Sequence, residues 1–194
     1  MQAEASRGAG LTFHHSCVSV PPITAESGVN LPKRSHKRGG QLVDPVTKMP
    51  GHLLRRCHQI DVAVFLDECL GFDLTPPQFV TLSALSTYGA LDKATIGGIA
   101  ALDRTTVAVV LKNLQERGFV VSKPSDQDRR STLNEITETG LATLRDVLPD
   151  VQRVQERVLS PLSDSERAEF VRLLTKISDA NNLLSRAPQR TPKS

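Results

Sequence analysis

The stretch from Asp103 to Ile136 restricts the possible folds of this chain more than any other part of the sequence. After Asp103 comes RTTVAVVLKNLQERG, where apolar residues recur at helical spacing, and Gly118 stands where helices commonly end. Two short runs rich in β-branched residues follow, Phe119–Lys123 and Thr132–Ile136, and the polar hexapeptide DQDRRS lies between them. The sequence therefore predicts a helix followed directly by a two-stranded hairpin.

A shorter helical segment precedes this block. In LTPPQFVTLSAL, Thr75 is suited to cap a helix and Pro76 to occupy its first position. A second short helix is expected from about Lys93, with a turn on either side. The order helix, turn, helix and hairpin is that of a winged helix-turn-helix, in which one helix fits the major groove of B-DNA. We therefore expect residues 75–136 to form a DNA-binding domain.

The helix that opens at Asp103 is the expected recognition helix, because it directly precedes the hairpin. Its inward face is expected to carry Val107, Val110, Leu111 and Leu114. The outward face and its borders then carry Thr105, Thr106, Val109, Lys112 and Asn113. Threonine hydroxyls can reach base edges or phosphates, valine can touch a thymine methyl group, asparagine can pair with adenine, and lysine suits a phosphate. The alternative is a helix-turn-helix used only for packing, and the hairpin argues against it.

The hexapeptide DQDRRS places two adjacent arginines at the expected tip of the hairpin. A hairpin beside a recognition helix lies along the duplex, so Arg129 and Arg130 are expected to enter the adjacent minor groove. Asp126 and Asp128 are expected to orient these arginines through ion pairs, because acids would be out of place in a bare phosphate clamp. The alternative is a solvated polar turn.

Further helical segments flank the winged domain in the sequence. One runs from His52 to Leu70, a long one starts at Thr137, and a capping box at Ser163 and Glu166 opens the last. Their apolar stripes are, in turn, Leu53, Cys57, Ile60 and Val64; Leu141, Leu144, Leu148, Val151, Val154 and Val158; and Phe170, Leu173, Leu174, Ile177 and Leu184. A small winged domain cannot cover this surface, which a second subunit would bury. We expect residues 50–74 and 137–185 to form a helical dimerisation domain, within a fold that is mainly α with a small β-hairpin wing.

Both ends of the chain are poor in apolar residues. Residues 1–48 are dominated by Gly, Pro, Ser, His and basic residues, a composition that predicts a disordered leader. Translation from Met49 would leave this leader out of the native protein, whereas its basic cluster KRSHKR is an alternative candidate for a DNA-binding arm. Residues 186–194 are expected to form a flexible tail.

The segments LTPPQFVTLSAL, LDRTTVAVVLKNLQERGFVV and PSDQDRRSTLNEITETG resemble the MarR family of bacterial regulators. The resemblance extends from about Pro50 to Leu184, and the leader has no counterpart in the family. It implies a homodimer that binds a pseudo-palindromic operator in double-stranded DNA. It also implies a small effector, often a phenolic or aromatic acid, that weakens this binding. The expected function is therefore that of a repressor released by a small aromatic carboxylate.

The first helix carries the candidate effector site. In HLLRRCHQIDVAVF, the residues on or beside its polar face are Arg55, Arg56, His58 and Gln59. A guanidinium group can pair with a carboxylate, and an imidazole can bind a ring hydroxyl or nitrogen. This stretch is similar to MarR regulators that repress nicotinate degradation and respond to hydroxylated nicotinic acid. The alternative is that these side chains are solvated or bridge to the partner subunit.

The cysteines allow a second type of regulation. Cys57 falls on the expected apolar face of the first helix and is expected to be packed and inert, while Cys69 is less constrained. A redox-sensing regulator is therefore an alternative function, which requires an exposed thiol with a lowered pKa. A third alternative is a winged-helix adaptor that binds proteins. An adaptor would require an acidic or markedly apolar recognition helix, and this helix is neither.

Several other functions find no support in the sequence. No apolar run approaches the length of about 20 residues that spans a bilayer, and three cysteines without a CxxC pair fit a reducing compartment. We therefore expect a soluble, cytoplasmic bacterial protein. The phosphate-binding loop, G-x-S-x-G and H-E-x-x-H motifs are missing, so we expect neither an enzyme nor a cofactor. His14 and His15 have no spaced partner ligands, so no metal site is predicted.

Overall fold

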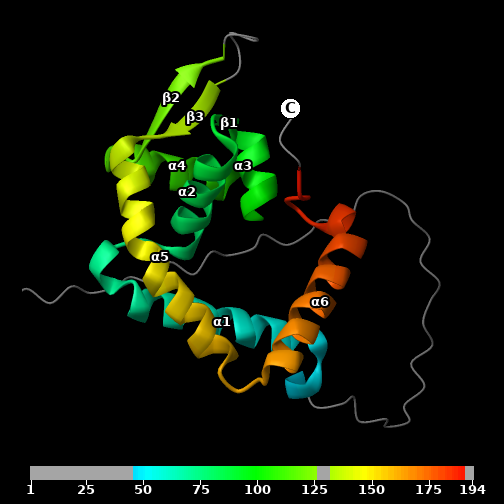
Figure 1. Cartoon of the computed structure of the whole chain (residues 1–194). Coiled ribbons are helices and arrows are strands. Elements are labelled where there is room, and N and C mark those ends of the chain that lie inside the picture. Colours follow the sequence, from blue (N-terminus) through cyan, green and yellow to red (C-terminus); the bar gives the residue numbers. More distant parts are fainter. Residues whose placement is uncertain (1–45, 126–131, 191–194) are drawn as a thin grey trace, which may run out of the picture. The chain divides into compact units, whose positions relative to one another are not determined.

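The computed structural model describes residues 46–125 and 132–190, and all the described elements belong to one contact unit, residues 42–194. Helices dominate this unit, and a small sheet lies at one end of it (Figure 1). In chain order the elements are η1 Val46–Lys48, α1 Pro50–Glu68, η2 Leu70–Phe72, α2 Pro76–Tyr88, β1 Leu91–Asp92, α3 Lys93–Ala100, α4 Arg104–Glu116, β2 Val120–Pro124, β3 Thr132–Ile136, α5 Glu138–Leu159, α6 Asp164–Ala180 and η3 Asn182–Leu184.

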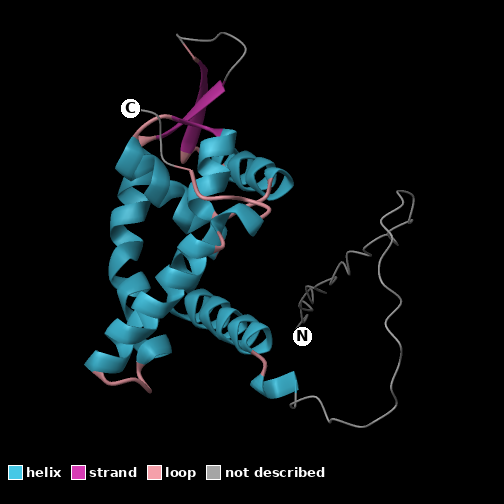
Figure 2. Ribbon diagram, turned by 90° about the vertical axis from the view of Figure 1, so that its right-hand side faces the viewer, coloured by secondary structure: helices cyan, strands magenta, loops and turns pink. Residues whose placement is uncertain are grey.

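The predicted winged helix-turn-helix is confirmed, with one strand more than expected. Strands β2 and β3 pair antiparallel, from Val120 opposite Ile136 to Pro124 opposite Thr132. The short β1 pairs with the other edge of β3, so the sheet order is β1-β3-β2. Figure 2 shows the strands gathered at one end of the helices. The residues before Lys93 were predicted to form a turn, because two residues are too few to show the alternation of a strand.

Local chemistry explains where the helices of this domain begin. Thr75 and Gln78 form a capping box at the start of α2, with Pro76 in the first turn as predicted. Asp92 accepts hydrogen bonds from the backbone N–H groups of Ala94 and Thr95, and thereby caps α3. These caps satisfy backbone donors that have no partner within the helix.

The core lies mainly within the winged domain. All four residues predicted to face inward on α4 are buried, and Leu82, Leu85 and Ile96 pack with them. On α5 the predicted stripe is wrong at one position, because Val147 is fully buried while Leu148 is 43% exposed. Both residues fit an apolar helical face in the sequence, and only the packed neighbours distinguish them.

Helix α1 packs against α5, and charged side chains tie the two together. Arg157 Nη1 on α5 lies 2.5 Å from Asp67 and 2.9 Å from Glu68 on α1, and Arg153 Nε lies 3.3 Å from the same Glu68. These groups are partly exposed, so each ion pair contributes on the order of 1 kcal/mol or less. The main effect of these ion pairs is to fix the register of α1 on α5, and their contribution to the stability of the fold is small.

Large apolar surfaces of the outer helices remain uncovered within one protomer. The sequence predicted more apolar surface on these helices than one chain can cover, and Leu53 and Ile60 on α1, with Leu173 and Ile177 on α6, are all more than 40% exposed. Helix α6 buries no residue at all. Cys57 shares the exposed surface of α1, which corrects the expectation that it is packed.

The two described ends also differ from the sequence-based expectation. Residues 46–48 form the 3-10 helix η1, which contacts α1, although the predicted disordered leader extended to residue 48. Residues 186–190 lie against α3 instead of forming a free tail. Within the described ranges, no single helix is long and apolar enough to span a membrane; α3 and α4 meet that test only as a pair, bent by 104°.

Candidate nucleic-acid interface and effector site

Asp103 sets the start of the recognition helix α4. Its Oδ1 accepts hydrogen bonds from the N–H groups of Thr105 at 2.9 Å and Thr106 at 3.0 Å, and its Oδ2 accepts the Thr106 hydroxyl at 3.0 Å. The hydrogen bonds from Thr106 hold the pKa of Asp103 below its ordinary value, so the cap remains anionic. The Thr106 hydroxyl, predicted to contact DNA, is thus engaged in the cap.

The other predicted contacts lie together on the outer face of α4. Thr105, Val109, Lys112 and Asn113 are all exposed, and Val109 retains 54% of its accessible surface. Lys112 lies 3.7 Å from Glu116 one turn later, but both groups are largely exposed, so this pair leaves Lys112 able to bind phosphate. An exposed aliphatic side chain between polar neighbours is suited to contact a thymine methyl group.

A chain of hydrogen bonds connects α4 to the sheet. Gln115 Nε2 on α4 donates to Ser122 Oγ on β2 at 2.5 Å, and Ser122 Oγ donates to Asn134 Oδ1 on β3 at 2.9 Å. Asn134 is fully buried, and its Nδ2 donates to the Leu91 carbonyl oxygen on β1 at 3.2 Å. The hairpin therefore has a fixed orientation relative to the recognition helix. The predicted wing residues Arg129, Arg130, Asp126 and Asp128 lie outside the described residues.

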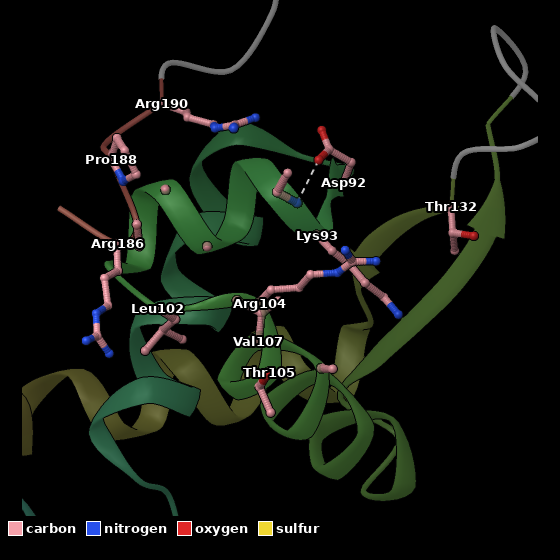
Figure 3. Close-up of a pocket in the computed structure, with 15 residues that line it drawn as sticks. Asp92, Lys93, Leu102, Arg104, Thr105, Val107, Thr132, Arg186, Pro188 and Arg190 are labelled. Carbon is pink, nitrogen blue, oxygen red and sulfur yellow. Dashed lines mark hydrogen bonds between the residues drawn. The ribbon is translucent and has the colours of Figure 1, made fainter. Parts of the chain in front are cut away.

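Two cations that were not predicted from the sequence lie beside the recognition helix. Lys93 is the first residue of α3 and Arg104 the first of α4, and both line a cavity of about 1030 Å³ between these helices and the start of β3. Figure 3 shows the Arg104 side chain extending toward Lys93. Each of the two directly follows an aspartate that caps its helix. This sequence signal predicts where a helix starts, but it does not predict that the two helix starts lie close together in the fold.

A second hollow, of about 360 Å³, lies on α1. It is lined by His52, Arg55, Arg56, Gln59, Ile60 and Ala63. Three of the four predicted effector residues are therefore brought together here, whereas His58 is absent from the described lining. His52 was missed, although its Nε2 is buried and has no hydrogen-bond partner among the described residues. Two guanidinium groups, an amide, an imidazole nitrogen and an apolar floor are suited to hold an aromatic carboxylate.

Cys69 does not meet the requirements of a redox sensor. Cys69 is buried, and this burial raises the pKa of its thiol above the ordinary value of 9.0, with the Asp150 and Glu68 carboxylates adding to the effect. A reactive thiol requires the opposite shift. Among the described residues, no group of three or more His, Cys, Asp or Glu side chains could hold a metal ion.

Comparison with known proteins identifies the family. The MarR family model matches residues 74–132. Over 136 residues the chain is 34% identical to the HTH-type transcriptional repressor NicR of Pseudomonas putida, which covers 70% of this chain and 86% of NicR. The chain belongs to the MarR family.

Solved structures of other MarR regulators agree with this assignment. BpsR of Bordetella bronchiseptica, whose DNA binding is regulated by 6-hydroxynicotinic acid, superposes with a TM-score of 0.67 at 32% identity, over 70% of this chain and 96% of BpsR. PcaV of Streptomyces coelicolor, solved with its natural ligand, superposes with a TM-score of 0.64 at 31% identity, over 71% of this chain and 97% of PcaV. The protein is thus a MarR-family transcriptional regulator with a DNA-binding winged helix, and regulators of this family bind DNA as dimers.

Proposed function

We propose that this MarR-family regulator represses transcription as a homodimer on a pseudo-palindromic operator, and that a small aromatic carboxylate bound at α1 releases it. The hollow formed by Arg55, Arg56, Gln59 and His52 is the observation that carries this proposal. Hydroxylated nicotinate is the first candidate, because it combines a carboxylate, a ring nitrogen and a ring hydroxyl. The regulation of BpsR by 6-hydroxynicotinic acid supports the same choice of chemical class.

The exposed apolar faces support the dimer. Leu53 and Leu66 on α1, and Val171, Leu173 and Ile177 on α6, retain between 43% and 54% of their surface. Uncovered apolar side chains that recur along two helices favour burial against a second copy. A dimer also presents two recognition helices, which a pseudo-palindromic operator requires.

The position of the hollow provides a route from effector to DNA. Helix α1 packs on α5, and α5 continues directly from strand β3 of the winged domain. An effector that binds one spacing of the two recognition helices better than the DNA-competent spacing would shift the population away from DNA. It can do so only by its difference in affinity for the two states.

Calorimetry with 6-hydroxynicotinate, nicotinate and salicylate tests the proposal, together with operator binding measured by fluorescence anisotropy. We expect one of these acids to bind and to weaken operator binding. Arg55→Ala, Arg56→Ala and His52→Ala should each weaken acid binding by about tenfold or more, the loss expected when a charged hydrogen bond of about 1.5–3 kcal/mol is removed. His58→Ala provides a matched control on the same helix and should bind the acid normally. Full binding in all three lining variants would place the effector elsewhere.

A further inference from the structure

The segment that follows η3 turns back onto itself. The Gln189 N–H donates to Asn182 Oδ1 at 2.6 Å, and Asn182 Nδ2 donates to the Gln189 carbonyl oxygen at 3.4 Å. The Ala187 N–H donates to Ser185 Oγ at 3.1 Å within the same turn. These bonds give residues 185–190 a defined path, and we call this segment the C-terminal strap.

The strap lies directly on α3, where glycine leaves room for it. A Cβ atom at Gly98 would come within 2.8 Å of both Arg190 Cγ and the Pro188 carbonyl oxygen. Real Cβ contacts are not this short, so the approach depends on glycine at this position. Ala187 and Pro188 are half-buried in the same contact. The path of the strap over α3 therefore depends on the absence of a side chain at Gly98.

The strap changes the charge of the cavity beside the recognition helix. Of the described side chains that line this cavity, four are cationic, namely Lys93, Arg104, Arg186 and Arg190, and one is anionic, Asp92. Figure 3 shows the two strap arginines on the side of the cavity opposite Lys93, with Arg190 extending toward Asp92. The Asp92 carboxylate is already occupied by three hydrogen bonds at the start of α3. The cavity therefore offers an excess of positive charge next to α4.

We propose that the strap is part of the DNA-binding surface, where Arg186 and Arg190 bind backbone phosphates beside the groove that α4 enters. The occupant is double-stranded DNA, because the cations border Thr105 and Ala108 on the exposed side of the recognition helix. Such contacts carry no sequence information and add affinity equally to every duplex. The proposal rests on DNA binding by the winged domain and adds to it a surface that lies about 80 residues further along the chain.

The test is the salt dependence of DNA binding by the full chain and by the Arg186→Ala/Arg190→Ala double variant, on operator and on an unrelated duplex. Each lost phosphate contact lowers the slope of log K against log salt by about 0.9, so a dimer that loses four contacts should lose about 3.6. Affinity should fall by the same factor on both duplexes, leaving their ratio unchanged. The control variant Lys48→Ala/Arg145→Ala loses the same charge from exposed positions outside the cavity. Its slope of log K against log salt should remain steeper than that of the Arg186→Ala/Arg190→Ala variant.

A second variant separates the position of the strap from its charge. Gly98→Leu retains both arginines but displaces the strap, so it should also flatten the slope, provided that thermal unfolding shows an intact fold. A slope in the double variant equal to that of the charge control would overturn the proposal. Tighter DNA binding in the double variant would also overturn it, since the strap would then obstruct the duplex. Failure of the wild type to prefer operator over unrelated DNA would instead contradict the proposed function.

Discussion

Arg117 Nη1, at the end of the recognition helix, donates a hydrogen bond to the Asp73 carbonyl oxygen at 2.6 Å, and Nη2 donates to the Phe72 carbonyl oxygen at 3.0 Å. The same guanidinium group lies 4.5 Å from the centre of the Phe119 ring. Asp73 has a left-handed backbone conformation, with φ of 50°, in the connection between α1 and α2. One side chain thus joins the end of α4 to the connection between α1 and α2.

Arg117→Ala should lower the free energy of unfolding by about 1–3 kcal/mol, because two charged hydrogen bonds and a cation–π contact are lost. Arg117→Lys should recover only part of this, since an ammonium group cannot contact two carbonyl oxygens in the fixed fork geometry of guanidinium. Urea denaturation measures both. Arg172→Ala is the control, because its pair with Glu169 on α6 is exposed and should contribute less than about 1 kcal/mol. Equal stability of the Arg117→Ala variant and the control would contradict the assigned role.

Asn134 is the second residue whose loss should be costly. Asn134→Leu removes the partner of the Leu91 carbonyl oxygen and of the Ser122 hydroxyl, and a buried unsatisfied group costs about 1–3 kcal/mol. Amide hydrogen exchange in β3 should accelerate as β1 and β2 lose their common connection. Ser122→Ala removes the bonds to Gln115 and Asn134 but keeps the buried bond from Asn134 to the Leu91 carbonyl oxygen, and Ser122 is exposed, so this variant should have a smaller effect. Unchanged exchange in the Asn134→Leu variant would show that backbone pairing alone orients the sheet.

Helix starts and helix faces in this chain are encoded by residues that are close together in the sequence. Asp103, Thr75 and the inward face of α4 were predicted correctly, because capping and helical periodicity involve residues close together in sequence. The burial of Val147 in place of Leu148 depends on which residues of α1 and α2 face α5. Such contacts between distant segments have no signature within any one of them.

In the candidate sites too, features set by neighbouring residues could be predicted from the sequence, and features that join distant segments could not. The outward residues of α4 could be predicted from the helical period. The contribution of Lys93, Arg104 and the strap arginines could not, since the cavity joins residues separated by up to 98 positions along the chain. His52 was missed because it lies one turn before the arginines, and only the three-dimensional hollow places it beside them.

The two described cysteines should differ sharply in reactivity. Burial raises the pKa of Cys69, so at neutral pH its thiol remains protonated, whereas Cys57 is exposed on α1. Alkylation of the folded protein should therefore modify Cys57 first and Cys69 only with unfolding. Because the folded pKa of Cys69 is raised, its contribution to stability is complete below pH 9.0 and declines as pH rises above that value. Loss of operator binding on peroxide treatment that Cys69→Ser prevents would restore the redox hypothesis.

Deletion of residues 1–45 should leave dimerisation and operator binding nearly unchanged. Every element of the described fold begins at Val46 or later, and η1 contacts α1, so the deletion should end before Val46. The comparison protein is the full chain with KRSHKR changed to neutral residues. Specific binding that is lost in both variants would identify this cluster, residues 33–38, as a DNA-binding arm. Size-exclusion chromatography with light scattering and anisotropy on operator DNA provide the measurements.

Arg130→Ala, and to a smaller degree Arg129→Ala, should weaken operator binding without lowering stability, because exposed substitutions usually change the unfolding free energy by less than about 0.5 kcal/mol. The hairpin that carries them is oriented by the hydrogen bonds that join Gln115, Ser122 and Asn134, so its strands lead from the recognition helix in a fixed direction.

Arginines that enter a minor groove respond to its width, which is narrow in A-tracts. The Arg130→Ala variant should therefore lose more affinity on an operator with A·T-rich flanks than on one with G·C-rich flanks. The strap variants should lose the same factor on both. Equal losses for Arg130→Ala on the two operators would assign this arginine to a phosphate, and unchanged affinity on both would remove the wing from the interface.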